Sequence, residues 1–198
     1  MQKRAKTSFP VHDLIASRWS PLAFADRPVE REILGSLLEA ARWAPSCFNE
    51  QPWAFLVATS AEAESFERLA SCLVEGNSWA KQAPVLMLSV AKLAFERNGR
   101  PNRHALHDLG LAAGNLVMQA QALGLAVHQM GGFDVHRARE LLGIPEGFEP
   151  VAMIAVGYPG DPESLPEALK KKELGPRTRN AASDFVFSGR WKQAAKFV

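Results

Sequence analysis

The sequence predicts a single α+β domain in which helices and strands form a mixed layer around one core. Three observations carry this prediction. The chain has 198 residues, of which 47% are hydrophobic and 22% charged, a composition typical of a globular domain. Several short apolar runs have the length of buried strands, and several longer stretches repeat apolar residues at helical spacing. These segments alternate imperfectly, which argues against a doubly wound parallel sheet.

The first half of the chain contains two helical patterns separated by a strand. Apolar side chains recur at helical spacing over residues 29–43. Pro28 is expected in the first turn of this helix, and Pro45 is expected to end it, because the residue before a proline avoids helical dihedrals. Residues 54–58 form a short apolar run typical of a buried strand, and residues 66–73 predict a second amphipathic helix.

The middle of the chain contains a second buried strand and the strongest helical pattern. Residues 85–91 form an apolar run with the length of a strand. Residues 108–123 repeat apolar side chains at helical spacing, with Asp108 as the expected N-cap and Gly124 as the expected end. Residues 125–130 then predict another strand, which leads into a pair of glycines.

A short helix, a strand and an irregular tail complete the chain. Asp134 is expected to cap a helix that runs to residue 142, and residues 151–156 form a third clear apolar strand. The tail after Pro159 is rich in proline, lysine and glutamate, and residues 185–187 offer one last short strand. We therefore divide the chain into an N-terminal extension at residues 1–11, a domain at 12–160 and a C-terminal arm at 161–198.

The tail has two interpretations. It is either a frayed end or an arm that packs on a partner subunit, since a compact domain rarely ends in so long an irregular segment. Disordered tails usually lack large aromatic side chains, so their presence here favours packing. The aromatic residues of this tail are Phe185, Phe187, Trp191 and Phe197.

Charge and cysteine content exclude several classes of function. The formal net charge is +2, so the whole chain has no electrostatic reason to bind nucleic acid or an acidic membrane. No run approaches the roughly 20 apolar residues of a membrane span, and the basic start lacks an apolar signal core. Cys47 and Cys72 form no CxxC pair and fit unpaired thiols in a reducing compartment. We therefore expect a cytoplasmic protein.

A polar segment at residues 44–53 joins the first predicted helix to the first strand. It contains Asn49 and Gln51, whose amides each carry one acceptor and two donors, a set suited to a heterocycle with alternating donors and acceptors. The alternative is a capped turn that satisfies its own backbone. The residue types alone leave both interpretations open.

Phosphate recognition is suggested by arginines at the two ends of the chain. Arg18 lies two residues before Ser20, and Arg177 and Arg179 flank a threonine. Arginine forks match phosphate oxygens, and a serine hydroxyl adds a donor. The alternative is solvated surface, and the sequence does not show that these residues meet. Glycines 131–132 allow close backbone approach to a ligand or form a plain turn, and they match no phosphate-binding fingerprint.

Taken together and in order, these segments resemble the FMN-dependent nitroreductase family. The likeness covers about residues 12–187, and its most specific part is the APSxxNxQPW block. The segments that carry it are RWS at 18–20, ARWAPSCFNEQPW at 41–53, DLGLAAGNL at 108–116, ALGL at 122–125, MGGFD at 130–134, IPEGFEP at 144–150 and VGYP at 156–159.

The resemblance implies a homodimer with two FMN sites at the subunit interface. It also implies a central mixed sheet wrapped by helices, and a domain-swapped C-terminal arm that adds a strand to the partner. The residues that it assigns to FMN are Arg18, Trp19, Ser20, Arg177 and Arg179 at the phosphate and ribityl end, Pro45, Ser46, Cys47, Asn49 and Gln51 from the other subunit, and Met130, Gly131 and Gly132 along the flavin ring.

The chain departs from the family pattern at three positions. Leu22 stands where a second basic residue is common, which removes one phosphate or ribityl contact. Cys47 stands where serine is common, and Trp19 where a small or basic residue is common. At Trp19 the expected cofactor contact is therefore reduced to the backbone.

The activity implied by the resemblance is a two-step exchange. NAD(P)H passes a hydride to FMN and leaves, and a small-molecule acceptor such as a nitroaromatic or a quinone then takes the electrons at the same site. No catalytic side chain is required. By similarity, Asn77 and Trp79 lie near the substrate. The loop 92–103 is a candidate lid whose basic side chains attract the dinucleotide phosphates, and its alternative is a solvated charged loop. These side chains are Lys92, Arg97, Arg100 and Arg103.

Three rival interpretations are weighed against this one. A non-catalytic flavin carrier or sensor would bind FMN but turn over NAD(P)H slowly. A dehalogenase-like FMN enzyme on the same scaffold would need substrate-gripping insertions, for which the chain has little room. His104 and His107 with Asp108 have the spacing of metal ligands, but no second cluster completes a site, so no metal is expected.

Overall fold

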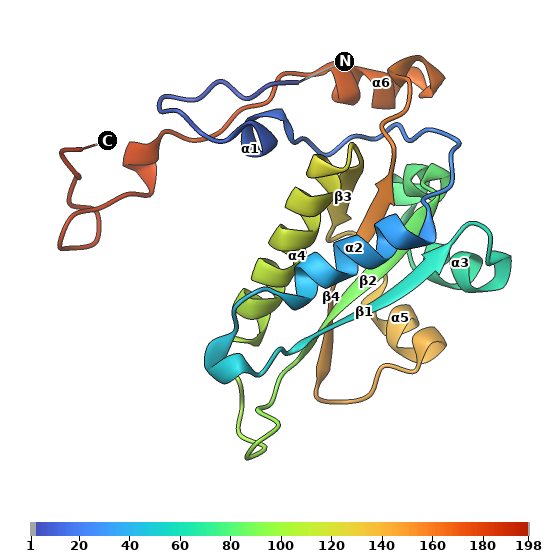
Figure 1. The fold of residues 1–198 in the computed structure, drawn as a ribbon, viewed down its shortest axis with the longest axis horizontal. Coiled ribbons are helices and arrows are strands. Elements are labelled where there is room, and N and C mark those ends of the chain that lie inside the picture. The colour runs from blue at the N-terminus through green and yellow to red at the C-terminus, as the bar shows by residue number, and fades with distance from the viewer. Residues whose placement is uncertain (1–2, 198) are drawn as a thin grey trace.

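The computed structural model describes residues 3–197 as a four-stranded sheet with helices packed on both faces (Figure 1). The sheet order is β1-β2-β4-β3, and each of its three pairings is antiparallel. This confirms the α+β class and corrects the expectation of mixed strand directions, because no parallel pair occurs within the described chain. The strands are β1 (Trp53–Thr59), β2 (Val85–Lys92), β3 (Ala126–Met130) and β4 (Phe148–Gly157).

The helices divide between the two faces of this sheet. α2 and α4 lie against one face, and α3 and α5 lie against the other (Figure 1). Within residues 3–197, no helix has the length and the apolar character that crossing a membrane requires. The α-helices are α1 (Asp13–Ser17), α2 (Arg31–Arg42), α3 (Ala63–Ala70), α4 (Ala105–Ala122), α5 (Val135–Leu142) and α6 (Glu167–Leu174), and the short 3-10 helices include η1 (Cys47–Asn49), η2 (Glu75–Gln82) and η4 (Ala182–Asp184).

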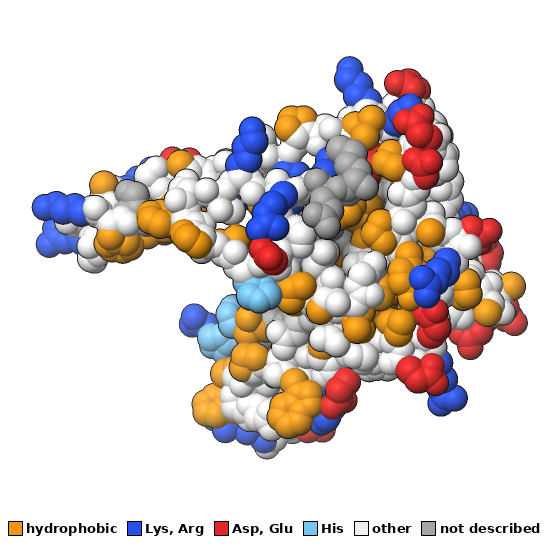
Figure 2. Space-filling model, turned by 45° about the horizontal axis from the view of Figure 1, so that its top comes forward, with side chains coloured by type: hydrophobic (Ala, Val, Ile, Leu, Met, Phe, Trp, Pro, Cys, Tyr) orange, Lys and Arg blue, Asp and Glu red, His pale blue; other side chains and the backbone are white. Residues whose placement is uncertain are grey.

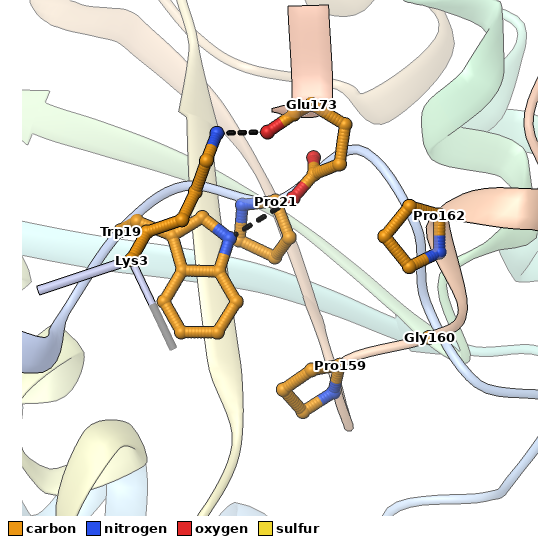
Figure 3. A pocket seen from close by; sticks show the side chains of 7 residues that line it. All are labelled: Lys3, Trp19, Pro21, Pro159, Gly160, Pro162 and Glu173. Atoms are coloured by element: carbon orange, nitrogen blue, oxygen red, sulfur yellow. Dashed lines mark hydrogen bonds between the residues drawn. The ribbon is translucent and has the colours of Figure 1, made fainter. Parts of the chain in front are cut away.

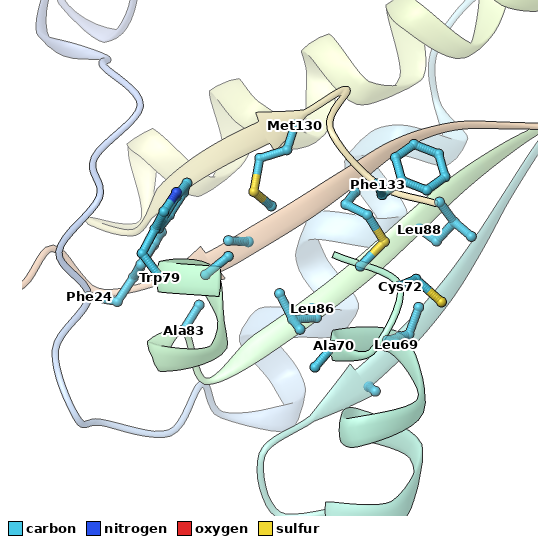
Figure 4. Close-up of a cluster of buried hydrophobic side chains, with 14 of the residues drawn as sticks. Phe24, Leu69, Ala70, Cys72, Trp79, Ala83, Leu86, Leu88, Met130 and Phe133 are labelled. Carbon is cyan, nitrogen blue, oxygen red and sulfur yellow. The ribbon is translucent and has the colours of Figure 1, made fainter. Parts of the chain in front are cut away.

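The core is divided by the central strand β2, whose side chains alternate between the two faces of the sheet. Leu86 and Leu88 pack toward α3 and α5, whereas Val85 and Met87 pack toward α2 and α4. All four are fully buried, which is why this strand is a continuous apolar run in the sequence. Figure 4 shows the cluster on the α3 and α5 side, which includes the Trp79 ring of η2.

Several predicted boundaries are corrected by the structure. α2 begins at Arg31 with Glu30 as its N-cap, so Pro28 precedes the helix instead of occupying its first turn. α4 begins at Ala105, and Asp108 is a buried residue of that helix, not its N-cap. The prediction that Asp134 caps α5 is confirmed, because its Oδ1 accepts a hydrogen bond from the backbone N–H of Arg137 at 2.9 Å.

The tail contains one helix that the sequence pattern did not predict. α6 has charged side chains around most of its circumference and therefore no apolar stripe. Beyond α6 the chain projects away from the body (Figure 1). The strand expected at residues 185–187 is absent from the described chain, where Phe187 makes one isolated bridge to Ala194 after the short helix η4.

Candidate functional site

A basic cavity of about 370 Å³ lies where the start of the chain meets the segment after α6. It brings together Arg18, Arg177 and Arg179, which the sequence could not place beside one another. Five of its lining residues are cationic, and within residues 3–197 none of its lining residues is acidic. The lining residues are Lys3, Arg18, Trp19, Ser20, Lys172, Gly175, Pro176, Arg177, Thr178 and Arg179.

The arginines of this cavity are close enough to perturb one another. Burial lowers the pKa of Arg18, and the neighbouring charges of Arg177 and Arg179 lower it further. Burial also lowers the pKa of Arg177, with a further contribution from Arg179. Arginine remains protonated at neutral pH, so the cavity concentrates positive charge that an anion would relieve.

The arginine donors of the cavity have different local partners. Arg177 donates to the backbone carbonyls of Ala16, at 3.0 Å, and of Lys3, so it also ties the N-terminal extension to the arm. Arg18 donates to Ser20 Oγ at 3.3 Å, and Arg179 donates to the carbonyl of Thr178 at 2.7 Å. Each guanidinium carries five N–H donors, so these bonds leave further donors for a phosphate.

A second cavity of about 230 Å³ shares Arg18 and Ser20 with the first. Its other lining residues come from α4 and β3, so it extends the basic cavity along the groove between these two elements. They are Gly114, Val117, Met118, Val127 and Gln129. A phosphate ester held in the basic cavity therefore has an adjoining, less charged space for the rest of the molecule.

The glycine pair after β3 is held by a neighbouring amide. A side chain on Gly132 would place a Cβ 2.6 Å from Asn77 Nδ2, and that nitrogen donates to the Gly132 carbonyl at 2.8 Å. Gly131 is exposed with open space around it. Met130 is buried, and Figure 4 shows its side chain among the core residues, so its backbone alone is available to line a ligand.

The polar loop after α2 is conformationally strained. Phe48, Asn49 and Gln51 all have positive φ angles, of 54°, 58° and 50°, which non-glycine residues rarely adopt. Such strain persists where surrounding contacts enforce it and is common at functional sites. Here the backbone N–H of Gln51 donates to Ser46 Oγ at 3.0 Å, and the Gln51 amide donates to the carbonyl of Asn49 at 3.0 Å.

A buried carboxylate from α4 anchors this loop. Asp108 Oδ2 accepts a hydrogen bond from the backbone N–H of Cys47 at 2.9 Å, and its side chain is 3% exposed. Its other oxygen lies 3.0 Å from Nδ1 of the exposed His107. Pro45 and Ser46 lead into the anchored segment. Sequence reasoning named Asp108 as a helix cap and missed this contact, which joins residues 61 positions apart.

The charged loop after β2 packs against the polar loop. Arg97 lies 3.9 Å above the ring centre of Phe48, and Glu50 Oε2 accepts a hydrogen bond from the backbone N–H of Glu96 at 2.7 Å. The predicted residues Arg100 and Arg103 are exposed on the same loop. The structure therefore brings the candidate lid to the polar loop through Arg97, one of the basic side chains expected on the lid, and through the bond between Glu50 and the Glu96 backbone, which was not predicted.

The polar loop and the basic cavity of one chain lie at opposite ends of α4 (Figure 1). Asp108 contacts the loop, and Gln121 contacts Ser17, the residue before Arg18, at 3.2 Å. The thirteen helical steps from Asp108 to Gln121 correspond to about 20 Å. One chain therefore does not bring together all the residues assigned to FMN.

The predicted substrate residues differ in their surroundings. Asn77 lies beside the glycine pair, as described above. The Trp79 residue is 7% exposed, and its ring lies 4.6 Å from the His128 ring and stacks against Phe24. Trp79 therefore packs in the core.

Lys3 and Lys172 line the cavity without having been predicted, and Glu173 lies in a smaller space beside it. Lysines in basic segments look like solvated surface in a sequence, and only tertiary contact distinguishes the two that line the cavity. Within residues 3–197, no group of three or more histidine, cysteine, aspartate or glutamate side chains could hold a metal ion.

An α+β fold with a basic cavity opening onto a groove beside an edge strand defines a protein suited to a phosphate-bearing ligand. The sequence profile of the Nitroreductase family matches residues 15–158. The chain belongs to the nitroreductase family.

Individual relatives are similar over most of their length. A crystal structure described as an oxidoreductase containing FMN is 37% identical, with a TM-score of 0.89, and the match covers 95% of this chain and 96% of that one. The NADH dehydrogenase of Thermus thermophilus is 28% identical over 165 residues, which are 68% of this chain and 79% of that protein. A protein of Archaeoglobus fulgidus, provisionally named NADH dehydrogenase/NAD(P)H nitroreductase, is 28% identical over 160 residues, which are 78% of this chain and 88% of that protein.

Proposed function

We propose that this protein is an FMN-dependent oxidoreductase that acts as a homodimer, with each FMN held between two subunits. The observation that carries the proposal is the separation of the strained polar loop from the basic cavity, at opposite ends of α4 in one chain. A two-fold axis perpendicular to α4 would place the loop of one subunit beside the cavity of its partner.

Two uncovered surfaces support a second subunit. α4 exposes Leu106 and Leu111 together with the small residues Gly110 and Gly114, and a side chain built at either glycine would meet no neighbour. The arm exposes Phe185 and other aromatic side chains, and Figure 2 shows apolar side chains uncovered along the projecting arm. Contiguous exposed apolar surface marks interaction sites, so we assign both surfaces to the partner.

The basic cavity fits the phosphate of FMN. Arg18, Arg177 and Arg179 offer forked donors without a lining carboxylate to oppose an anion, and Ser20 adds a hydroxyl. Trp19 contributes its backbone there. The glycines at 131–132, and the backbone of the residue before them, would approach the ring closely because no side chain intervenes.

The partner's loop would complete the site. Pro45, Ser46 and Cys47 would line the ring, and the amides of Asn49 and Gln51 would offer donors and acceptors to its edge. When bound, FMN supplies the capacity to accept a hydride and to pass electrons on. The chain contributes binding, orientation and positive charge near the cofactor, and no acid or base side chain is needed.

The two substrates would use the site in turn. With FMN bound, the site would accept a hydride from NAD(P)H, which would leave before a nitroaromatic, quinone or similar acceptor takes the electrons from the reduced flavin. Arg100 and Arg103 would attract the dinucleotide phosphates from the loop that packs on Phe48, and Asn77 would border the substrate. Because Trp79 is buried, we assign it to the support of that region and expect no direct substrate contact.

The test begins with purified protein and added FMN. We expect one FMN per subunit, a dimer by sedimentation, bleaching of the flavin by NAD(P)H and recovery of the colour on addition of a quinone or nitroaromatic. Double-reciprocal plots of initial rate against NAD(P)H concentration, taken at several acceptor concentrations, should give parallel lines. Intersecting lines would contradict exchange at a shared site, stable colour with NAD(P)H would indicate a carrier, and a monomer without flavin uptake would refute the proposal.

A further inference from the structure

A buried carboxylate lies directly behind the basic cavity. Glu173 is 6% exposed and is the buried residue of α6, a helix whose other side chains are largely exposed. Its Oε1 accepts a hydrogen bond from Trp19 Nε1 at 3.1 Å (Figure 3). Its Oε2 accepts one from the backbone N–H of Leu22 at 2.6 Å. Both carboxylate oxygens are thereby directed at the segment that contains Arg18 and Ser20.

Burial of this carboxylate requires a specific reason. Removing an ionised carboxylate from water is unfavourable unless donors replace the lost hydration, and an apolar side chain could cover the same surface. Hydrogen bonds differ from apolar contacts because they fix direction as well as distance. The two donors therefore define how α6 is placed against the segment at residues 18–22.

Glu173 joins the two halves of the basic cavity. Arg177 and Arg179 follow it by four and six residues, whereas Trp19 lies between Arg18 and Ser20 in sequence. Its backbone carbonyl also accepts a hydrogen bond from Lys3 Nζ, so the N-terminal extension reaches the same residue (Figure 3). Three cavity segments, which are remote in sequence, meet on this one residue.

The carboxylate does not face the cavity that would hold the anion. Glu173 lines a separate space of about 30 Å³ with Trp19, Pro21 and the turn at residues 159–162, and it is absent from the lining of the 370 Å³ cavity. The carboxylate bonds instead to the Trp19 indole and the Leu22 backbone. It can therefore hold the segment at residues 18–22 in place without competing for the phosphate-facing donors of the arginines.

We infer that Glu173 and Trp19 form a positioning pair that holds the two arginine segments at the spacing required by a phosphate group. The pair acts through Arg18, Arg177 and Arg179 and does not touch the ligand. It also gives a role to the Trp19 indole, whose Nε1 donates to the carboxylate. The inference rests on the proposed FMN site and deepens it.

The test compares ligands with and without a phosphate. FMN and riboflavin share the ring and the ribityl chain, so the ratio of their dissociation constants isolates the phosphate contribution. Glu173→Gln presents one acceptor and one NH2 group to two N–H donors and so loses one bond, and Trp19→Phe removes the indole donor. Glu167→Gln is the matched control, because Glu167 is an exposed carboxylate on the same helix.

We expect the preference for FMN over riboflavin to fall by about tenfold in Glu173→Gln and in Trp19→Phe, the scale of one lost hydrogen bond in each case. The double variant should lose less than the product of the two single effects, because both remove the same contact. Glu167→Gln should stay within about twofold of the parent protein. Trp19→Phe retains the carboxylate, so it carries the test if Glu173→Gln does not fold.

Equal losses for FMN and riboflavin would overturn the inference, because they would indicate a general structural role. Tighter FMN binding by Glu173→Gln would overturn it too, because the carboxylate would then act by repulsion alone. If the parent protein shows no preference for FMN, the proposed function fails at its phosphate site. In that case, the Tm of the parent protein and of Glu173→Gln is measured with and without inorganic phosphate. A rise in Tm that occurs only in the parent protein supports the positioning pair, and any other result refutes it.

Discussion

Asp108→Ala should release the strained polar loop. The substitution removes an acceptor that lies 2.9 Å from the Cys47 N–H and leaves that N–H without its carboxylate partner. A hydrogen bond to a charged group contributes about 1.5–3 kcal/mol, and the Asp108 side chain is only 3% exposed, so little solvent screening reduces that figure. We therefore expect a loss of about 2–3 kcal/mol in the free energy of unfolding, or roughly 4–12 °C in Tm for a chain of this size.

Two assays separate release of the loop from general loss of stability. Urea unfolding gives the free energy, and modification by a thiol reagent under native conditions reports the loop, because Cys47 is partly exposed whereas Cys72 is fully buried. Asp108→Ala should increase the rate of Cys47 modification. His107→Ala is the matched control: His107 contacts the other oxygen of Asp108, and its removal keeps the Cys47 bond. An unchanged unfolding midpoint with unchanged thiol reactivity would refute the reasoning.

Three further predictions concern separate parts of the molecule. Gly160→Ala should lower the free energy of unfolding by about 3 kcal/mol, because its Cβ would lie 2.5 Å from the backbone carbon of Phe24. Urea unfolding measures this loss, and a loss under 1 kcal/mol would contradict the contact. Burial lowers the pKa of His128 below 6.5, so the native state binds its proton less readily than the unfolded state. The free energy of unfolding that neutral His128 contributes is fully present above pH 6.5 and is lost as the pH drops through the native pKa. His128→Gln should therefore make the free energy of unfolding depend less on pH between pH 7 and 5. Arg18→Ala should weaken FMN binding at least tenfold and reduce its salt dependence in fluorescence titrations, whereas equal salt dependence would remove Arg18 from the phosphate contact.

The strands were the part of the fold most accessible to sequence reasoning. Residues 85–91 were predicted as a strand, and β2 (Val85–Lys92) differs by one residue. The reason is physical: β2 is covered by helices on both faces, so burial alone produces a continuous apolar run. The tail segment at 185–187 has a similar composition but no neighbouring strand within the described chain, so β propensity alone was insufficient.

The carboxylates that organise the site were less accessible. Asp108 precedes an apolar stripe, as an N-cap does, yet its partner is the backbone of Cys47, 61 residues earlier. Glu173 lies in a highly charged helix, and its partners Trp19 and Leu22 are 154 and 151 residues away. Local patterns report helix ends and apolar faces, whereas contacts at this separation depend on how the elements pack.

The central claim is that each cofactor site draws its two halves from different subunits, and subunit mixing tests it most directly. One variant carries Arg18→Ala and Arg179→Ala in the basic cavity, and the other carries Asn49→Ala and Gln51→Ala in the polar loop. Neither should bind FMN alone. After unfolding and refolding together in equal amounts, half of the dimers pair the two variants, and each such dimer has one intact site, so about a quarter of the sites should bind FMN again. No recovery in refolded mixed dimers would contradict the account.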